Sequence, residues 1–105
     1  MSKLKIKIPS KTIEEFCMKW NITEFALFGS VLRDDFNPDS DIDVLVTFDH
    51  IAKTTLFDLA RMQKELEEIF GRHVDILSRR GVESGRNKRR RDAILNSAVV
   101  VYGAR

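Results

Sequence analysis

The sequence contains little that would suit a secreted, membrane-spanning or disulfide-stabilised protein. Its 105 residues include one cysteine, Cys17, which excludes an internal disulfide and a cysteine-based zinc cluster. No apolar run approaches the ~18 residues of a membrane-spanning helix, and the basic residues 1–8 lack the apolar stretch of a signal peptide. Neither a Walker P-loop nor a dinucleotide-binding fingerprint is present. We therefore expect a cytoplasmic protein with no membrane partner.

The composition is that of one globular domain over residues 1–105. Hydrophobic residues make up 43% of the chain and charged residues 32%, which indicates a folded rather than a disordered protein. The net charge is only +2, but residues 34–49 contain six acids and no Lys or Arg, whereas residues 79–92 contain seven bases. Such runs are commonly solvated surfaces, yet together they also suggest a site where metal ions and phosphates meet.

Helical and strand patterns alternate along the chain. A capping box at Thr12 and Glu15 predicts a first helix that ends near Asn21. We expect the further elements to be strands at 22–28, 41–48 and 73–77, helices at about 54–70 and 87–97, and a loop at 81–85. The VVVY segment after Ala98 either completes the last helix or adds a short strand. This order predicts an α/β (α+β) fold, in which a small mixed sheet is covered by helices on one side.

Three aspartates occupy strand positions where apolar residues are usual. Asp41 and Asp43 are two residues apart, so they project from one face, about 6.6–6.8 Å apart along the strand. Asp75 would face the same site if its strand lay beside theirs. Bare carboxylates this close repel each other, and a hard divalent cation relieves that conflict. The simpler alternatives are a loop cap for Asp41 and a solvated edge-strand face for Asp43 and Asp75.

A glycine turn directly follows the strand at 22–28. Gly29 lets the backbone approach an anion closely, the following N–H groups favour phosphate, and Ser30 adds a hydroxyl donor. A plain tight turn is the commoner use of Gly-Ser. Joined to the aspartates, however, the turn gives G-S-x10-D-x-D over residues 29–43. This pattern resembles the signature of the DNA polymerase β-like nucleotidyltransferase superfamily.

The stretches 27–33 and 38–46 are similar to one branch of that superfamily, the minimal nucleotidyltransferases. This branch contains the MntA-like antitoxins that are paired with HEPN toxins. The resemblance implies a nucleotidyltransferase fold and a role for each matching residue. The positions that match nucleotide-binding residues are Gly29, Ser30, Arg33 and Ser40. The positions that match catalytic and metal-binding residues are Asp41, Asp43 and Asp75.

The resemblance also implies a reaction: Mg²⁺-dependent transfer of AMP from ATP to a protein hydroxyl. Two Mg²⁺ ions are expected, with Mn²⁺ as the alternative, and Asp75 can act as base toward the acceptor. By family analogy the acceptor is a tyrosine of a cognate HEPN ribonuclease toxin, with which the chain forms a hetero-oligomer and acts as antitoxin. The alternative is a catalytically silent antitoxin that neutralises its partner by binding alone.

The basic segment 79–91 contains no interleaved aromatic residue, so it offers no stacking platform for nucleic acid. Its bases at the start of the expected helix 87–97 oppose the helix dipole, which indicates an anionic neighbour. Either the triphosphate or an acidic partner would fit. His73 lies two residues before Asp75 on the same side of its strand, although packing or a surface position is the commoner role for such a histidine.

Overall fold

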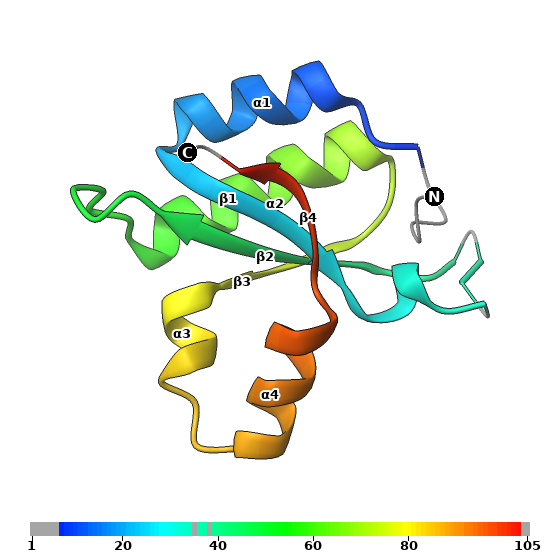
Figure 1. Ribbon diagram of the computed structural model, residues 1–105. Helices are drawn as coiled ribbons and strands as arrows, with labels where there is room; N and C mark the ends of the chain where they lie inside the picture. The colour runs from blue at the N-terminus through cyan, green and yellow to red at the C-terminus, as the bar shows by residue number, and fades with distance from the viewer. Residues whose placement is uncertain (1–6, 35, 38, 104–105) are drawn as a thin grey trace.

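The computed structural model describes residues 7–34, 36–37 and 39–103 (Figure 1). Its elements are α1 (Ser10–Lys19), β1 (Ile22–Phe28), the 3-10 helix η1 (Gly29–Leu32), β2 (Ile42–Phe48), α2 (Leu56–Phe70), β3 (Val74–Ser78), α3 (Arg79–Glu83), α4 (Lys88–Ser97) and β4 (Val99–Gly103). Among the described residues, no helix is both long and apolar enough to cross a membrane. The expected order of helices and strands is confirmed, with α3 and β4 added.

The four strands form one mixed sheet in the order β3-β2-β1-β4. β1 is antiparallel to both β2 and β4, whereas β2 and β3 are parallel. A parallel pair needs a crossover connection, and α2 supplies it. The VVVY segment is therefore an edge strand and does not extend α4.

Helices cover both faces of the sheet, so the expected one-sided cover is wrong. α1 and α2 pack on one face and α3 and α4 lie on the other (Figure 1). The cause is visible in β1, which is apolar on both faces. Phe25 and Leu27 join the core beneath α1 and α2. Ala26 and Phe28 point the other way and are buried with Ile94 of α4, because two apolar faces each need a cover.

The capping box expected at Thr12 and Glu15 does not start the first helix. α1 begins at Ser10, and no side chain caps it. The carbonyl of Pro9 instead accepts a hydrogen bond from the N–H of Ile13 at 2.9 Å. Proline has a fixed φ and disfavours helix in the residue before it, so a helix readily starts just after a proline.

Capping residues set the ends of the later helices. Thr55 caps α2 by accepting a hydrogen bond from the N–H of Asp58 at 3.2 Å, and Asp58 accepts one from the N–H of Thr55 at 3.0 Å. Gly71 ends α2 in the left-handed conformation, as its position predicts. Ser78 caps α3 by accepting a hydrogen bond from the N–H of Gly81 at 3.0 Å. Part of the expected loop at 81–85 is therefore helical.

Cys17 lies on the inner side of α1 and is fully buried, which confirms it as a core residue. Burial raises the pKa of its thiol to about 12. Because the thiolate is the nucleophilic form of cysteine, a thiol that stays protonated near neutral pH is unreactive. Cys17 therefore contributes to packing.

Leu66 gives a direct test of how α2 is held on the sheet. Its side chain is fully buried, whereas that of Leu56 on the same helix is 83% exposed. We expect Leu66→Ala to lower the free energy of unfolding by about 2–5 kcal/mol, because it leaves a cavity in the core. Leu56→Ala should change it by about 0.5 kcal/mol or less. Denaturant unfolding of both variants measures this, and equal effects would contradict the packing described.

Candidate active site

The parallel pairing of β2 with β3 brings together four ionisable side chains. Asp43 on β2 is directly opposite Asp75 on β3. Just before the two strands, the carbonyl of His73 accepts a hydrogen bond from the N–H of Ile42 at 3.0 Å, which aligns Asp41 with His73. Side chains two apart along a strand share a face. Asp41, Asp43, His73 and Asp75 therefore form one group, the carboxylate block, at the end of the sheet where β2 and β3 begin.

The surroundings of Asp43 disfavour the ionised form of its carboxyl group. Burial raises the pKa of its carboxyl, and the neighbouring charges of Asp75 and Asp41 raise it further. A hydrogen bond from the backbone of Ser30 and the charge of Arg33 act in the opposite direction without cancelling the rise. The site therefore favours an added positive charge, since a cation would stabilise all three carboxylates in their ionised form.

The glycine turn contacts both Asp43 on β2 and Asp41 just before it. Gly29 has a φ of +75°, and a Cβ placed on it would overlap the carboxylate of Asp43. Glycine is strongly favoured here, because of both the backbone angle and the close approach. The hydroxyl of Ser30 donates a hydrogen bond to the carbonyl of Asp41 at 2.9 Å. The structure thus brings Gly29 and Ser30 next to the carboxylates, as the sequence predicts.

The other two predicted nucleotide-binding residues lie on the loop between η1 and β2. Arg33 ends the 3-10 turn, where its N–H donates to the carbonyl of Ser30 at 3.0 Å. Its charge lowers the pKa of Asp43, so its guanidinium acts on the site. Ser40 lies just before Asp41, and its hydroxyl accepts a hydrogen bond from the N–H of Asn37 at 3.1 Å. Its side chain therefore shapes the loop that leads into β2.

Sequence reasoning missed Arg72, which holds that loop against β3. Its Nη1 atom donates to the carbonyls of Asn37 at 3.1 Å and Ser40 at 3.2 Å. Its guanidinium carbon also lies 4.8 Å from the ring centroid of Phe36, within cation–π distance. The parallel register of β2 and β3 was the signal that could have revealed Arg72. That register places Arg72, just before His73, beside Ser40, just before Asp41.

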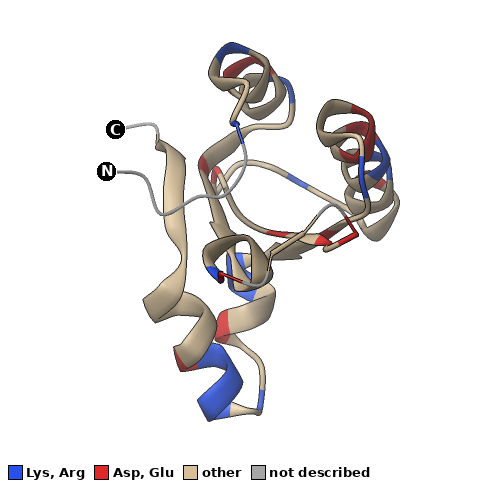
Figure 2. Ribbon diagram, turned by 90° about the vertical axis from the view of Figure 1, so that its right-hand side faces the viewer, with Lys and Arg blue, Asp and Glu red and all other residues tan. Residues whose placement is uncertain are grey.

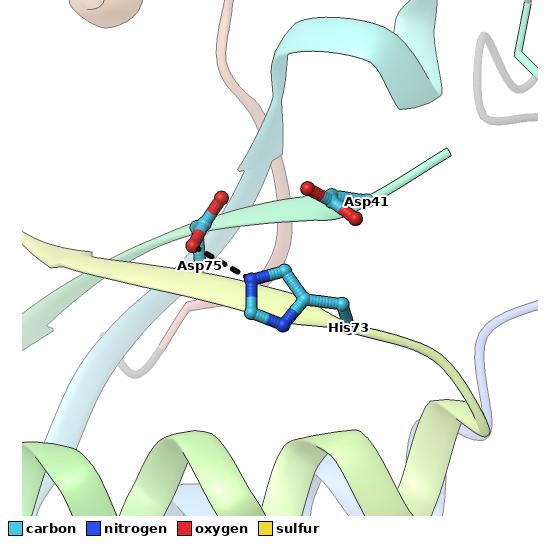
Figure 3. A group of neighbouring side chains, drawn as sticks. All are labelled: Asp41, His73 and Asp75. Atoms are coloured by element: carbon cyan, nitrogen blue, oxygen red, sulfur yellow. Dashed lines mark hydrogen bonds and ion pairs between the residues drawn. The ribbon is translucent and has the colours of Figure 1, made fainter. Parts of the chain in front are cut away.

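His73 joins the site from the start of β3 (Figure 3). Its Nε2 lies 3.2 Å from Oδ1 of Asp75, and its Nδ1 lies 2.9 Å from Oε2 of Glu67 on α2. Desolvation lowers the pKa of the imidazole, but the charges of Asp41, Asp75 and Glu67 outweigh it, so the pKa is raised. The side chain is 51% exposed, so His73 is a surface residue that also belongs to the carboxylate block.

The block has the right donor atoms for a divalent cation. Asp41, His73 and Asp75 each offer one ligand atom, and these atoms lie within 4.8 Å of one another. Two ligands of one Mg²⁺ ion are at most about 4.2 Å apart. Small rotations of exposed side chains would therefore close the group around an ion. Asp43 lies between Asp75 and the glycine turn, where it could serve as a further ligand.

The carboxylate block opens onto a cleft between the sheet and α4, with a volume of about 440 Å³. Asp43, Asp75, Phe28, Ile94 and Arg90 are among the residues that line it. Arg90 and Ile94 also line a neighbouring cavity of about 370 Å³ between β3, α3 and α4. Figure 2 shows the basic start of α4 in blue. Within this run, Arg90 is a base that reaches the carboxylate cleft.

Comparison with known proteins identifies the family. Residues 9–101 match the family described as Nucleotidyltransferase domain. One relative is MJ0435 of Methanocaldococcus jannaschii, which is provisionally named a protein adenylyltransferase. It is 37% identical over 84 residues, which cover 80% of this chain and 84% of the relative. Protein adenylyltransferase MntA of Thermococcus cleftensis is 31% identical over 72 residues, which cover 69% of this chain and 71% of the relative.

Solved structures have the same fold. One, provisionally described as a minimal nucleotidyltransferase, has a TM-score of 0.66 and 34% identity, with 86% of each chain covered. Another, a crystal structure of a toxin–antitoxin with AMP-PNP, has a TM-score of 0.71 and covers 93% of this chain and 76% of that chain. Its 15% identity supports the fold alone. By its family match and these relatives, the chain belongs to the nucleotidyltransferase domain family.

Proposed function

We propose that this chain transfers AMP from ATP to a hydroxyl of a partner protein. The observation that carries the proposal is the register of β2 with β3, which sets Asp43 opposite Asp75 beside the Gly29 turn. That arrangement combines a backbone turn suited to phosphate with carboxylates suited to a divalent cation. The names of two relatives support the same reaction, since one is named a protein adenylyltransferase and the other is provisionally named one.

In the proposed reaction the parts of the site have separate tasks, and Asp75 takes part in two of them. The turn at Gly29 and Ser30 holds the triphosphate, with Arg33 and Ser40 supporting the loop beside it. Asp41, Asp43 and Asp75 would hold Mg²⁺, in two sites as we propose, or Mn²⁺ in its place. The bound cations would neutralise charge on the phosphates.

The acceptor oxygen attacks the α-phosphorus in line. A new bond forms between that oxygen and phosphorus while the bond from phosphorus to the oxygen bridging the β-phosphate breaks. Pyrophosphate leaves, and the hydroxyl proton passes to Asp75. In phosphoryl transfer of this kind, the protein acts mainly by positioning groups and stabilising charge.

The acceptor, we propose, comes from a separate protein. We take residues 1–105 as a single minimal nucleotidyltransferase domain, and the exposed Asp41 and Asp75 leave the site open to a large partner. A solved neighbour of the same fold is a toxin–antitoxin with AMP-PNP. Following the family resemblance, we propose a tyrosine of a HEPN-type toxin as acceptor, with this chain as the cytoplasmic antitoxin in a hetero-oligomer.

The double variant Asp41→Asn/Asp43→Asn tests the reaction. With α-labelled ATP, Mg²⁺ and the product of the neighbouring gene, the wild-type chain should label the partner. The variant should reduce labelling at least about a hundredfold, because charge stabilisation of the phosphates is lost. Asp49→Asn is the matched control, since Asp49 lies in the loop beyond the far end of β2.

A different outcome would support neutralisation by binding alone. If the wild-type chain forms a stable complex and neutralises its partner without labelling it, and the double variant does the same, then adenylyl transfer is not its function.

A variant of Arg90 tests whether the basic start of α4 takes part in the reaction with ATP. Arg90 lines the carboxylate cleft, whereas Arg89 lines neither this cleft nor the cavity beside it. We expect Arg90→Ala to lower kcat/KM for ATP about 10–100-fold, the range for a lost charge-assisted hydrogen bond. Arg89→Ala should leave it within about twofold. Equal losses of partner binding in both variants, with unchanged kcat/KM, would instead assign the segment to docking.

A further inference from the structure

We propose that His73 is a nitrogen ligand of the cation held by Asp41 and Asp75, and that this position binds Mn²⁺ or Co²⁺ more tightly than Mg²⁺. This inference rests on the proposed function, which requires a bound cation. It extends the proposed function by naming the class of ion. The family resemblance accounts for the aspartates but gives no role to the histidine. In the structure, one ligand atom from each of the three residues lies within 4.8 Å of the others.

The imidazole ring is oriented from outside the cluster. Its Nδ1 lies 2.9 Å from Oε2 of Glu67, a residue of α2, the helix that precedes β3 in the chain. The same oxygen accepts a hydrogen bond from the N–H of Val74 at 3.2 Å, which fixes the carboxylate in turn. Histidines that bind metals almost always donate their second ring N–H to such an acceptor. Glu67 thereby leaves Nε2 of His73 facing the two aspartates.

The position of Nε2 suits a shared cation. It lies 3.2 Å from Oδ1 of Asp75, and the carboxylate of Asp41 faces the same space (Figure 3). On metal binding, the hydrogen bond between Nε2 of His73 and Oδ1 of Asp75 would be replaced by a bond from each of these two atoms to the same ion. Imidazole nitrogen suits first-row transition ions, Co²⁺ more than Mn²⁺, whereas Mg²⁺ prefers oxygen ligands and waters. Asp43, opposite Asp75 and next to the glycine turn, leaves an all-oxygen position there.

The test is pulsed electron paramagnetic resonance of Mn²⁺ bound to the full chain without an affinity tag, nucleotide or partner. A coordinated imidazole gives a ¹⁴N coupling on the Mn²⁺ spin. The chain has only two histidines, and His50 has a 95% exposed side chain in the loop after β2. We expect the coupling in the wild type and in His50→Gln, and its loss in His73→Gln. Mn²⁺ affinity should fall about tenfold or more in His73→Gln.

Two further measurements sharpen the result. Glu67→Gln keeps an acceptor oxygen for the ring and for Val74, so it should retain the coupling with a smaller loss of affinity than His73→Gln. The ratio of Mn²⁺ to Mg²⁺ affinity should fall in His73→Gln but not in His50→Gln. A ratio that is unchanged would show that the histidine only positions Asp75.

The proposal is overturned if the wild type binds no Mn²⁺, if bound Mn²⁺ shows no ¹⁴N coupling, or if the coupling survives in His73→Gln. Because no ATP or partner is present, these outcomes do not depend on adenylyl transfer. A chain that shows the coupling but labels no partner would keep the metal assignment and lose the proposed reaction.

Discussion

The parallel pairing of β2 with β3 is the interaction on which the rest of the site depends. It sets Asp43 opposite Asp75 and brings the residues before the two strands together. A slip of one residue would turn Asp75 toward the apolar core beneath α1 and α2, because successive side chains of a strand point to opposite faces. The crossover through α2 and the buried Val74 on β3 hold the register. The packing of the core thus places the carboxylates.

This arrangement is electrostatically unfavourable, because carboxylates of like charge lie close together. Contacts with neighbouring residues reduce that unfavourable energy. Asp43 has a raised pKa because burial and neighbouring carboxylates disfavour its charge. The backbone of Ser30 and the ring of His73 offset part of that cost with hydrogen bonds to Asp43 and Asp75. Arg72 fixes the loop before Asp41. A site held this way is arranged before its cation arrives, which favours tight and specific binding.

Local patterns predicted much of the fold and the candidate site. Alternation along residues 41–48 predicted that Asp41 and Asp43 face away from the buried Ile42 and Val44 of β2, and Gly71 marked the end of α2. The cover on the second face was missed because it depends on Ile94, far along the chain, packing beneath β1. The contacts of Arg72 were missed for a related reason, since they exist only in the parallel register. The position of His73 beside Asp75 was predictable, because the two residues lie on the same side of one strand.

The most direct test of the account is a crystal structure of the chain with Mn²⁺ and an ATP analogue carrying a methylene bridge between its α- and β-phosphates. The account predicts anomalous Mn²⁺ peaks coordinated by Asp41, Asp43 and Asp75, with the triphosphate on the turn at Gly29 and the α-phosphorus facing Asp75. Mn²⁺ and nucleotide bound elsewhere, or nucleotide bound with no Mn²⁺ at these carboxylates, would contradict it.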